Sequence, residues 1–191
     1  GSLKSCNYHC SYCPFSKKKG SARELEEDRE ALFRFVTQWE ENCAMQGALQ
    51  IVPYGEALIH SYYWEALARL SRLSRVDAVG AQTNLSFPVE SMIEHYLKCG
   101  GDIKKLRLWG TFHPQMTSME AFLKQCEKLS KFSVAYCVGT VGVPSQREMI
   151  RNLRKELPEE IYLWINKMDG LGRRYTEEEI TSEDVKTMKA V

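Results

Sequence analysis

Apolar and polar positions alternate along this chain with two spacings, one typical of helices and one typical of buried strands. Between residues 22 and 43, apolar side chains recur every three or four positions among acids and bases, which predicts a long amphipathic helix. Short apolar runs bounded by turn residues predict strands. The expected helices cover residues 22–43, 62–73, 88–99, 118–131 and 145–157, and the expected strands cover 48–54, 76–84, 104–112, 132–143 and 161–167.

Residues at the ends of these segments support the helix bounds. Ser118 is a suitable N-cap, because its hydroxyl can accept from a backbone N–H of the first turn. Pro88 suits a first helical turn, and Gly100 with Gly101 suits a helix C-terminus.

The strict alternation of strand and helix predicts an α/β fold with parallel strands and right-handed crossovers. The pattern alone leaves a doubly wound sheet and a full or partial barrel open, and a sixth strand is expected before the first cysteine. In both folds, chemistry gathers where the strands end and the chain turns into the next helix. Those ends are residues 53–56, 82–84, 111–114, 139–142 and 166–167, and the stretch with the first cysteines also precedes a helix.

Composition narrows the class of protein. The chain has 191 residues, 43% of them hydrophobic, which suits a single domain over residues 1–191. We interpret this domain as a fragment that is cut at both ends. A formal charge of +1 gives no reason to expect nucleic acid or an anionic membrane as partner. No apolar stretch is long enough to cross a bilayer, no signal peptide is recognisable, and the run 17–19 of three lysines is expected to be a solvated loop.

Seven cysteines in a chain of this size argue against a secreted disulfide framework, because the number is odd. They fit a reducing cytoplasm instead. Cys43, Cys99, Cys126 and Cys137 fall in helical or strand patterns, where cysteine usually packs as a small hydrophobic residue.

Cys6, Cys10 and Cys13 are different, because they fall within eight residues of one another. A structural zinc ion takes four ligands, so His9 would have to be the fourth. A disulfide would leave one of the three cysteines unpaired. An iron–sulfur cluster is held by thiolates, and three of them on a four-iron cluster leave one iron open to a substrate or cofactor.

The spacing Cys6-x-x-x-Cys10-x-x-Cys13, with Tyr12 before the last cysteine, resembles the signature loop of the radical S-adenosylmethionine (radical SAM) enzymes. The resemblance extends over nearly the whole chain. It implies a parallel (β/α)6 partial TIM barrel whose first strand is missing from this fragment. It also implies a [4Fe–4S] cluster on the three cysteines, with SAM chelating the fourth iron.

The resemblance further implies a reaction. An electron from the cluster cleaves SAM to methionine and a 5′-deoxyadenosyl radical, which abstracts hydrogen from a substrate. The substrate, a small molecule or a peptide, is not identified by these residues. An electron donor such as flavodoxin or ferredoxin is implied as a partner.

The family's cofactor-binding residues carry over to the strand ends. Gly55 and Glu56 match a Gly-Gly-Glu motif that binds the SAM ammonium, although Tyr54 replaces the first glycine. Tyr12 is expected near the adenine. The remaining expected contacts to SAM or substrate are Thr83, Asn84, His113, Val141 and Asn166.

Other interpretations stay open at this point. Asn84 suits an Asx turn as well as a ligand contact. The acid expected near Val141 is absent. A non-catalytic cluster-binding or metal-binding module, or a family member that binds a cluster without turnover, remains the alternative to a radical SAM enzyme.

Overall fold

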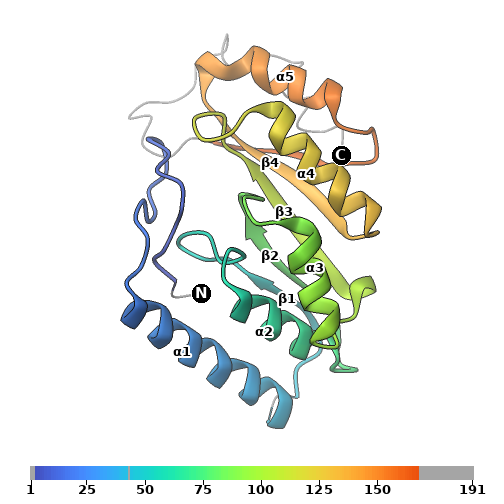
Figure 1. Ribbon diagram of the computed structural model, residues 1–191. Coiled ribbons are helices and arrows are strands. Elements are labelled where there is room, and N and C mark those ends of the chain that lie inside the picture. Colours follow the sequence, from blue (N-terminus) through green and yellow to red (C-terminus); the bar gives the residue numbers. More distant parts are fainter. Residues whose placement is uncertain (1–2, 43, 168–191) are drawn as a thin grey trace.

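The computed structural model describes residues 3–42 and 44–167 and shows one curled sheet of five parallel strands, in the order β1-β2-β3-β4-β5 (Figure 1). Because the order in the sheet equals the order in the sequence, each strand pairs with its successor through a helical crossover. The result is a half-barrel. The strands are β1 (Gly47–Ile51), β2 (Val76–Thr83), β3 (Leu106–Phe112), β4 (Ala135–Gly142) and β5 (Leu163–Lys167).

Helices connect the strands and cover the outer face of the curl (Figure 1). Helix α1 (Ala22–Glu41) precedes β1. The helices between strands are α2 (Ser61–Ser71), α3 (Val89–Lys98), α4 (Met119–Lys131) and α5 (Arg147–Glu156), with short 3-10 turns η1 (Ile103–Lys105) and η2 (Pro144–Gln146). The N-terminal loop, in dark blue, stands beside the carboxyl ends of the strands. None of the helices in the described ranges combines the length and apolarity that crossing a bilayer requires.

The core lies between the sheet and its helices. Along β3, Leu106, Leu108 and Phe112 are buried, and Phe112 packs against Phe122 of α4. The alternate positions, such as Trp109, are only half-buried. Since neighbouring side chains of a strand point to opposite faces, the helix side of the sheet is the core and the concave side is left more open.

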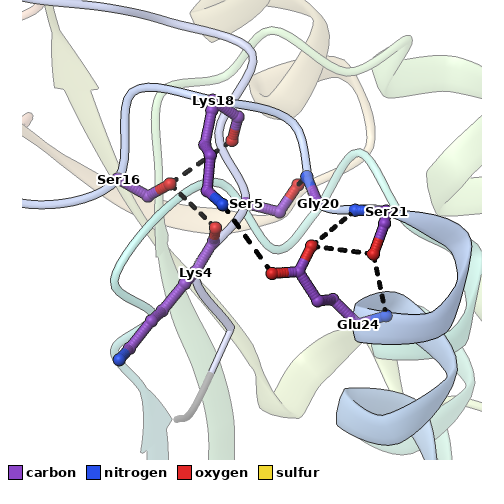
Figure 2. Close-up of polar contacts among 7 residues, drawn as sticks. All are labelled: Lys4, Ser5, Ser16, Lys18, Gly20, Ser21 and Glu24. Carbon is purple, nitrogen blue, oxygen red and sulfur yellow. Dashed lines mark hydrogen bonds and ion pairs between the residues drawn. The ribbon is translucent and has the colours of Figure 1, made fainter.

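Helix α1 begins with a capping box that Figure 2 shows in detail. The Ser21 hydroxyl accepts from the Glu24 N–H, and the Glu24 carboxylate accepts from the Ser21 N–H at 2.7 Å. Further along, Asp28 is buried and accepts hydrogen bonds from Tyr62 at 3.0 Å and Tyr63 at 2.7 Å. These bonds fix α1 against α2 and so fix where the preceding loop begins its approach to the sheet.

The predicted helices and strands are all present, and the fold class is confirmed. The Ser118 cap is present, and Gly100 follows α3 with φ +80°, as the expected C-terminus requires. Pro88 lies one residue before α3 in extended conformation, which corrects its expected place in the first turn.

The predicted strands were too long. Strand β1 stops before Pro53, which has no N–H for a ladder bond. Strand β4 starts only after Ser133, whose φ of +56° is not that of a strand. The turn η1 takes the residues expected to open β3. Cys43 and the C-terminal end of the chain lie outside the described residues. The described residues before Cys6, residues 3–5, form no strand.

Candidate functional site

The carboxyl ends of the strands and the N-terminal loop enclose a cavity of about 410 Å³. Every residue that the sequence proposes for a site lines this cavity. They are Cys6, Cys10, Tyr12, Cys13, Gly55, Glu56, Thr83, Asn84, His113, Val141 and Asn166. A smaller hollow of about 230 Å³, between residues 3–5 and the start of α1, includes none of them.

Backbone hydrogen bonds close the loop that bears the three cysteines, which we call the cysteine loop (residues 6–18). The Cys6 N–H donates to the Lys18 carbonyl at 2.9 Å, so the loop returns to its own start. The Ser16 hydroxyl donates to the Lys4 carbonyl at 2.8 Å (Figure 2). Inside the loop, the Cys13 N–H donates to the Cys10 carbonyl at 3.1 Å. These bonds, which are made by groups other than the thiols, close the loop that carries the three cysteines.

Side chains between the cysteines attach the cysteine loop to the strand ends. Asn7 donates to Ser86 at 2.8 Å and accepts from the Asn84 amide at 3.1 Å. On the other side, the Ser11 N–H donates to the Gln115 side chain at 2.8 Å. The loop is therefore joined to the segments after β2 and after β3.

The thiols share the cavity with different exposures. Cys10 is buried and Cys6 and Cys13 are half-buried, and all three are free. Burial raises the pKa of Cys10 to about 11 and also raises the pKa of Cys6, which a hydrogen bond from the Tyr8 N–H opposes. Without a cation these two thiols stay protonated at neutral pH, whereas a bound metal deprotonates its thiol ligands.

The donor set disfavours a single metal ion. Within residues 3–42 and 44–167, no three His, Cys, Asp or Glu side chains are arranged to hold one ion. His9, the fourth ligand that a zinc site would need, is exposed and is not among the residues that line the cavity. Three thiols facing a common space fit a group larger than an ion, and an iron–sulfur cluster is such a thiolate-bound group.

Glu56 is the acid of the cavity, and its side chain is held by the protein. One carboxylate oxygen accepts from the Leu58 N–H at 3.0 Å and from the Thr83 hydroxyl at 2.7 Å, and the other accepts from the Asn84 N–H. Burial raises the pKa of Glu56 to about 7, although these hydrogen bonds oppose the shift. A carboxylate offers about four acceptor positions, so one remains for a ligand.

Gly55 is required by the cysteine loop itself. A Cβ built on Gly55 would lie 2.0 Å from the Ser5 carbonyl oxygen, much closer than any real contact. That oxygen accepts from the Glu56 N–H at 2.8 Å, and the Tyr54 carbonyl accepts from the Ser16 N–H at 2.9 Å. The segment after β1 is thus the platform on which both ends of the loop lie.

His113, at the end of β3, is clamped between two tyrosines. The Tyr12 ring stacks on it with centroids 5.9 Å apart, and the Tyr8 ring meets it edge-on at 6.1 Å. The Tyr12 hydroxyl and His113 Nδ1 are 3.0 Å apart, so one donates to the other. Burial lowers the pKa of His113 to about 4, which keeps the imidazole neutral at physiological pH.

Val141 and Asn166 line the far end of the cavity from β4 and β5. The side-chain oxygen of Asn166 accepts from the Trp164 indole N–H. The side-chain nitrogen of Asn166 is the remaining donor group of this side chain. The side-chain oxygen of Asn84 accepts from the Ser86 N–H, as expected for an Asx turn, and the residue also lines the cavity.

Some residues that line or support the cavity were not singled out from the sequence. Tyr8 and Ser5 belong to no recognisable sequence motif. Their part in the site is visible only from the contact of Tyr8 with His113 and of Ser5 with the segment after β1. Gln82 and Thr111 lie in the strand-end stretches, so their positions were indicated but their part in the cavity was not.

Comparison with solved structures finds proteins that share this fold. A structure of anSMEcpe, a radical SAM anaerobic sulfatase maturase, with bound AdoMet matches 97% of this chain with a TM-score of 0.65 and 14% sequence identity. The fold is that of the radical SAM enzymes. A second anSMEcpe structure, with AdoMet and the Cp18Cys peptide, matches with a TM-score of 0.66, also at 14% identity.

The match covers only part of the relative. This chain spans 53% of the first anSMEcpe chain and 55% of the second. No protein-family model matches the chain, and neither does any curated protein sequence. The comparison therefore shows a fold shared with radical SAM enzymes.

Proposed function

We propose that this chain is the core of a radical SAM enzyme in which Cys6, Cys10 and Cys13 hold a [4Fe–4S] cluster. One observation supports the proposal most. Three thiols, Tyr12 of the same loop and seven residues from the five strand ends, all expected from the sequence, line one cavity. When bound, the cluster supplies the electron that cleaves SAM to methionine and a 5′-deoxyadenosyl radical.

The chain's own residues suit the binding of SAM in this cavity. Glu56 has one acceptor position left for the SAM ammonium, and Thr83 and Asn84 keep its carboxylate oriented. Tyr12 and His113 present a rigid, neutral aromatic surface to a ring or a ribose. Because these groups are already fixed by protein contacts, little conformational entropy is lost when a ligand binds.

The wider setting belongs to the same proposal. We assign residues 1–191 to one radical SAM core domain in a cytoplasmic enzyme, where reducing conditions keep the described cysteines as thiols. The substrate is a small molecule or a peptide. A relative that binds a peptide beside AdoMet supports including peptides.

Anaerobic iron–sulfur reconstitution tests this function, followed by incubation with SAM and dithionite. Iron per chain and 5′-deoxyadenosine are measured for the unchanged protein, for Cys10→Ala and for Cys99→Ala. Cys99 follows the last turn of α3, at the opposite end of the strands, so its variant is a matched control. We expect Cys10→Ala to lose both iron and product and Cys99→Ala to keep both.

Two results would contradict the proposal. Formation of 5′-deoxyadenosine by Cys10→Ala would show that the cysteine loop takes no part in the reaction. A well-formed cluster that yields no 5′-deoxyadenosine in the unchanged protein would favour a binding module or a family member without turnover.

A further inference from the structure

The turn that follows β2 has an unusual backbone conformation. Leu85 has a φ of +55°, in the left-handed region that residues other than glycine rarely adopt. Of the described residues other than glycine, only Leu85 and Ser133 have a positive φ. Ser133 precedes β4, whereas Leu85 directly follows Asn84, which lines the cavity. Such a conformation persists only where the surrounding contacts hold it.

Two contacts hold the inner side of this turn. The Leu85 side chain is buried against Gly110 of β3, where an added Cβ would lie 2.5 Å from a Leu85 methyl carbon. Gly110 therefore leaves the space that the Leu85 side chain fills. The Leu85 N–H donates to the Thr83 hydroxyl oxygen at 3.1 Å.

One residue of α4 holds the outer side of the turn. The amide nitrogen of Gln125 donates to the Leu85 carbonyl at 3.1 Å and to the Phe87 carbonyl at 2.8 Å. Both hydrogens of this nitrogen are thereby used. Gln125 is half-buried and is not among the residues that line the cavity. Its two bonds clasp the turn on both sides of Ser86 without reaching the cavity.

The turn positions two parts of the site. The Asn84 N–H donates to a carboxylate oxygen of Glu56. The Ser86 hydroxyl accepts from the Asn7 side chain of the cysteine loop at 2.8 Å. A change in the backbone at Leu85 would therefore displace a donor to Glu56 and an anchor of the cysteine loop together.

We propose that Gln125 is a positioning residue for the SAM site, because it holds Leu85 in its left-handed conformation and so keeps the Asn84 N–H on Glu56. The inference rests on the proposed function, in which Glu56 binds the ammonium of SAM. Without the two bonds from Gln125, the turn can relax to a negative φ at Leu85. The Asn84 N–H then leaves the carboxylate, and Glu56 is no longer directed at the ligand.

Two substitutions of Gln125 test this role. Gln125→Met keeps the length of the side chain but has no donor, whereas the ammonium of Gln125→Lys can donate to both carbonyls. Cys126→Ala is the matched control, because it removes a buried side chain from the same helix that makes none of these hydrogen bonds. SAM affinity of the reconstituted proteins is measured by equilibrium binding, and stability is measured by chemical denaturation. Hydrogen exchange of residues 84–87 is measured without SAM.

We expect Gln125→Met to lower the affinity for SAM about tenfold and to speed exchange of residues 84–87, because two carbonyls lose their donor. Gln125→Lys should recover most of the affinity. Cys126→Ala should be less stable and yet bind SAM as the unchanged protein does. In a Glu56→Gln background, Gln125→Met should change SAM affinity much less, because the group that it positions is already altered.

Three results would overturn the inference. They are unchanged SAM affinity in Gln125→Met, an equal loss of affinity in the Glu56→Gln background, and an equal loss in Cys126→Ala. The second would mean that Gln125 does not act through Glu56, and the third that any loss of stability has the same effect. Absence of SAM binding in the unchanged protein would instead contradict the proposed function itself.

Discussion

At the scale of single residues, the ionisation of Glu56 determines the charge inside the cavity. Its burial disfavours the charged form, whereas three hydrogen-bond donors favour it, and burial prevails, with a pKa of about 7. This acid is therefore partly protonated at neutral pH. Without a ligand the raised pKa makes the fold less stable as pH rises toward 7, because the unfolded chain binds fewer protons over that range.

A ligand ammonium reverses the preference, because it pairs with the ionised carboxylate. We expect the affinity of the reconstituted protein for SAM to rise about tenfold between pH 6 and pH 8, as the ionised fraction of a group with a pKa near 7 does. In Glu56→Gln the affinity should be lower and this rise should disappear. Equilibrium binding at both pH values measures it, with thermal unfolding to confirm that the variant is folded. A rise that persists in Glu56→Gln would assign the titration to another group.

At the scale of elements, the cysteine loop is positioned by the segment that follows β1. Ser5 and Ser16 bind that segment from the two ends of the loop, and Gly55 lets the Ser5 carbonyl approach. In Gly55→Ala the new methyl group would meet this oxygen, so the loop must move and the Glu56 N–H loses its partner. An unpaired buried donor costs about 1–3 kcal/mol.

We therefore expect Gly55→Ala to lower the free energy of unfolding by at least about 1–3 kcal/mol and to reduce the iron retained after reconstitution. Chemical denaturation and iron analysis measure the two effects. Tyr54→Ala is the control, because it removes only an exposed ring and keeps the carbonyl that binds Ser16. Equal iron retention in Gly55→Ala and the unchanged protein would show that the loop is not positioned through this contact.

The sequence was sufficient to predict the elements and the face that carries the site, but not the contacts that fix the cysteine loop and His113. Spacing predicted the helices, the strands and the face on which Cys10, Glu56 and His113 gather, because periodicity and chain order depend on local sequence. It did not predict that Ser5 lies against Gly55 or that Tyr8 and Tyr12 clamp His113. Those contacts join segments about 50 to 105 positions apart along the chain, and no local pattern encodes them.

At the scale of the whole molecule, the order of the strands makes the site. Five parallel strands in sequential order bring their carboxyl ends to one edge, so segments spread over most of the described chain enclose one cavity. The helices lie on the other face of the sheet, where they stabilise the edge without contributing to the cavity lining. A ligand in this cavity contacts many segments at once, and few of them are neighbours in sequence.

This arrangement predicts how hydrogen exchange should respond to SAM. A ligand that binds only the folded cavity suppresses local opening of every segment that lines it. We expect slower exchange of backbone amides in residues 6–16, 54–58, 82–86 and 111–115 when SAM binds the reconstituted protein. Peptides from α3, which packs against α2 and α4, should keep their exchange rates and provide the internal control. Protection limited to residues 6–16 would mean that SAM contacts the cysteine loop without entering the cavity, and the strand-end residues would then have no part in binding it.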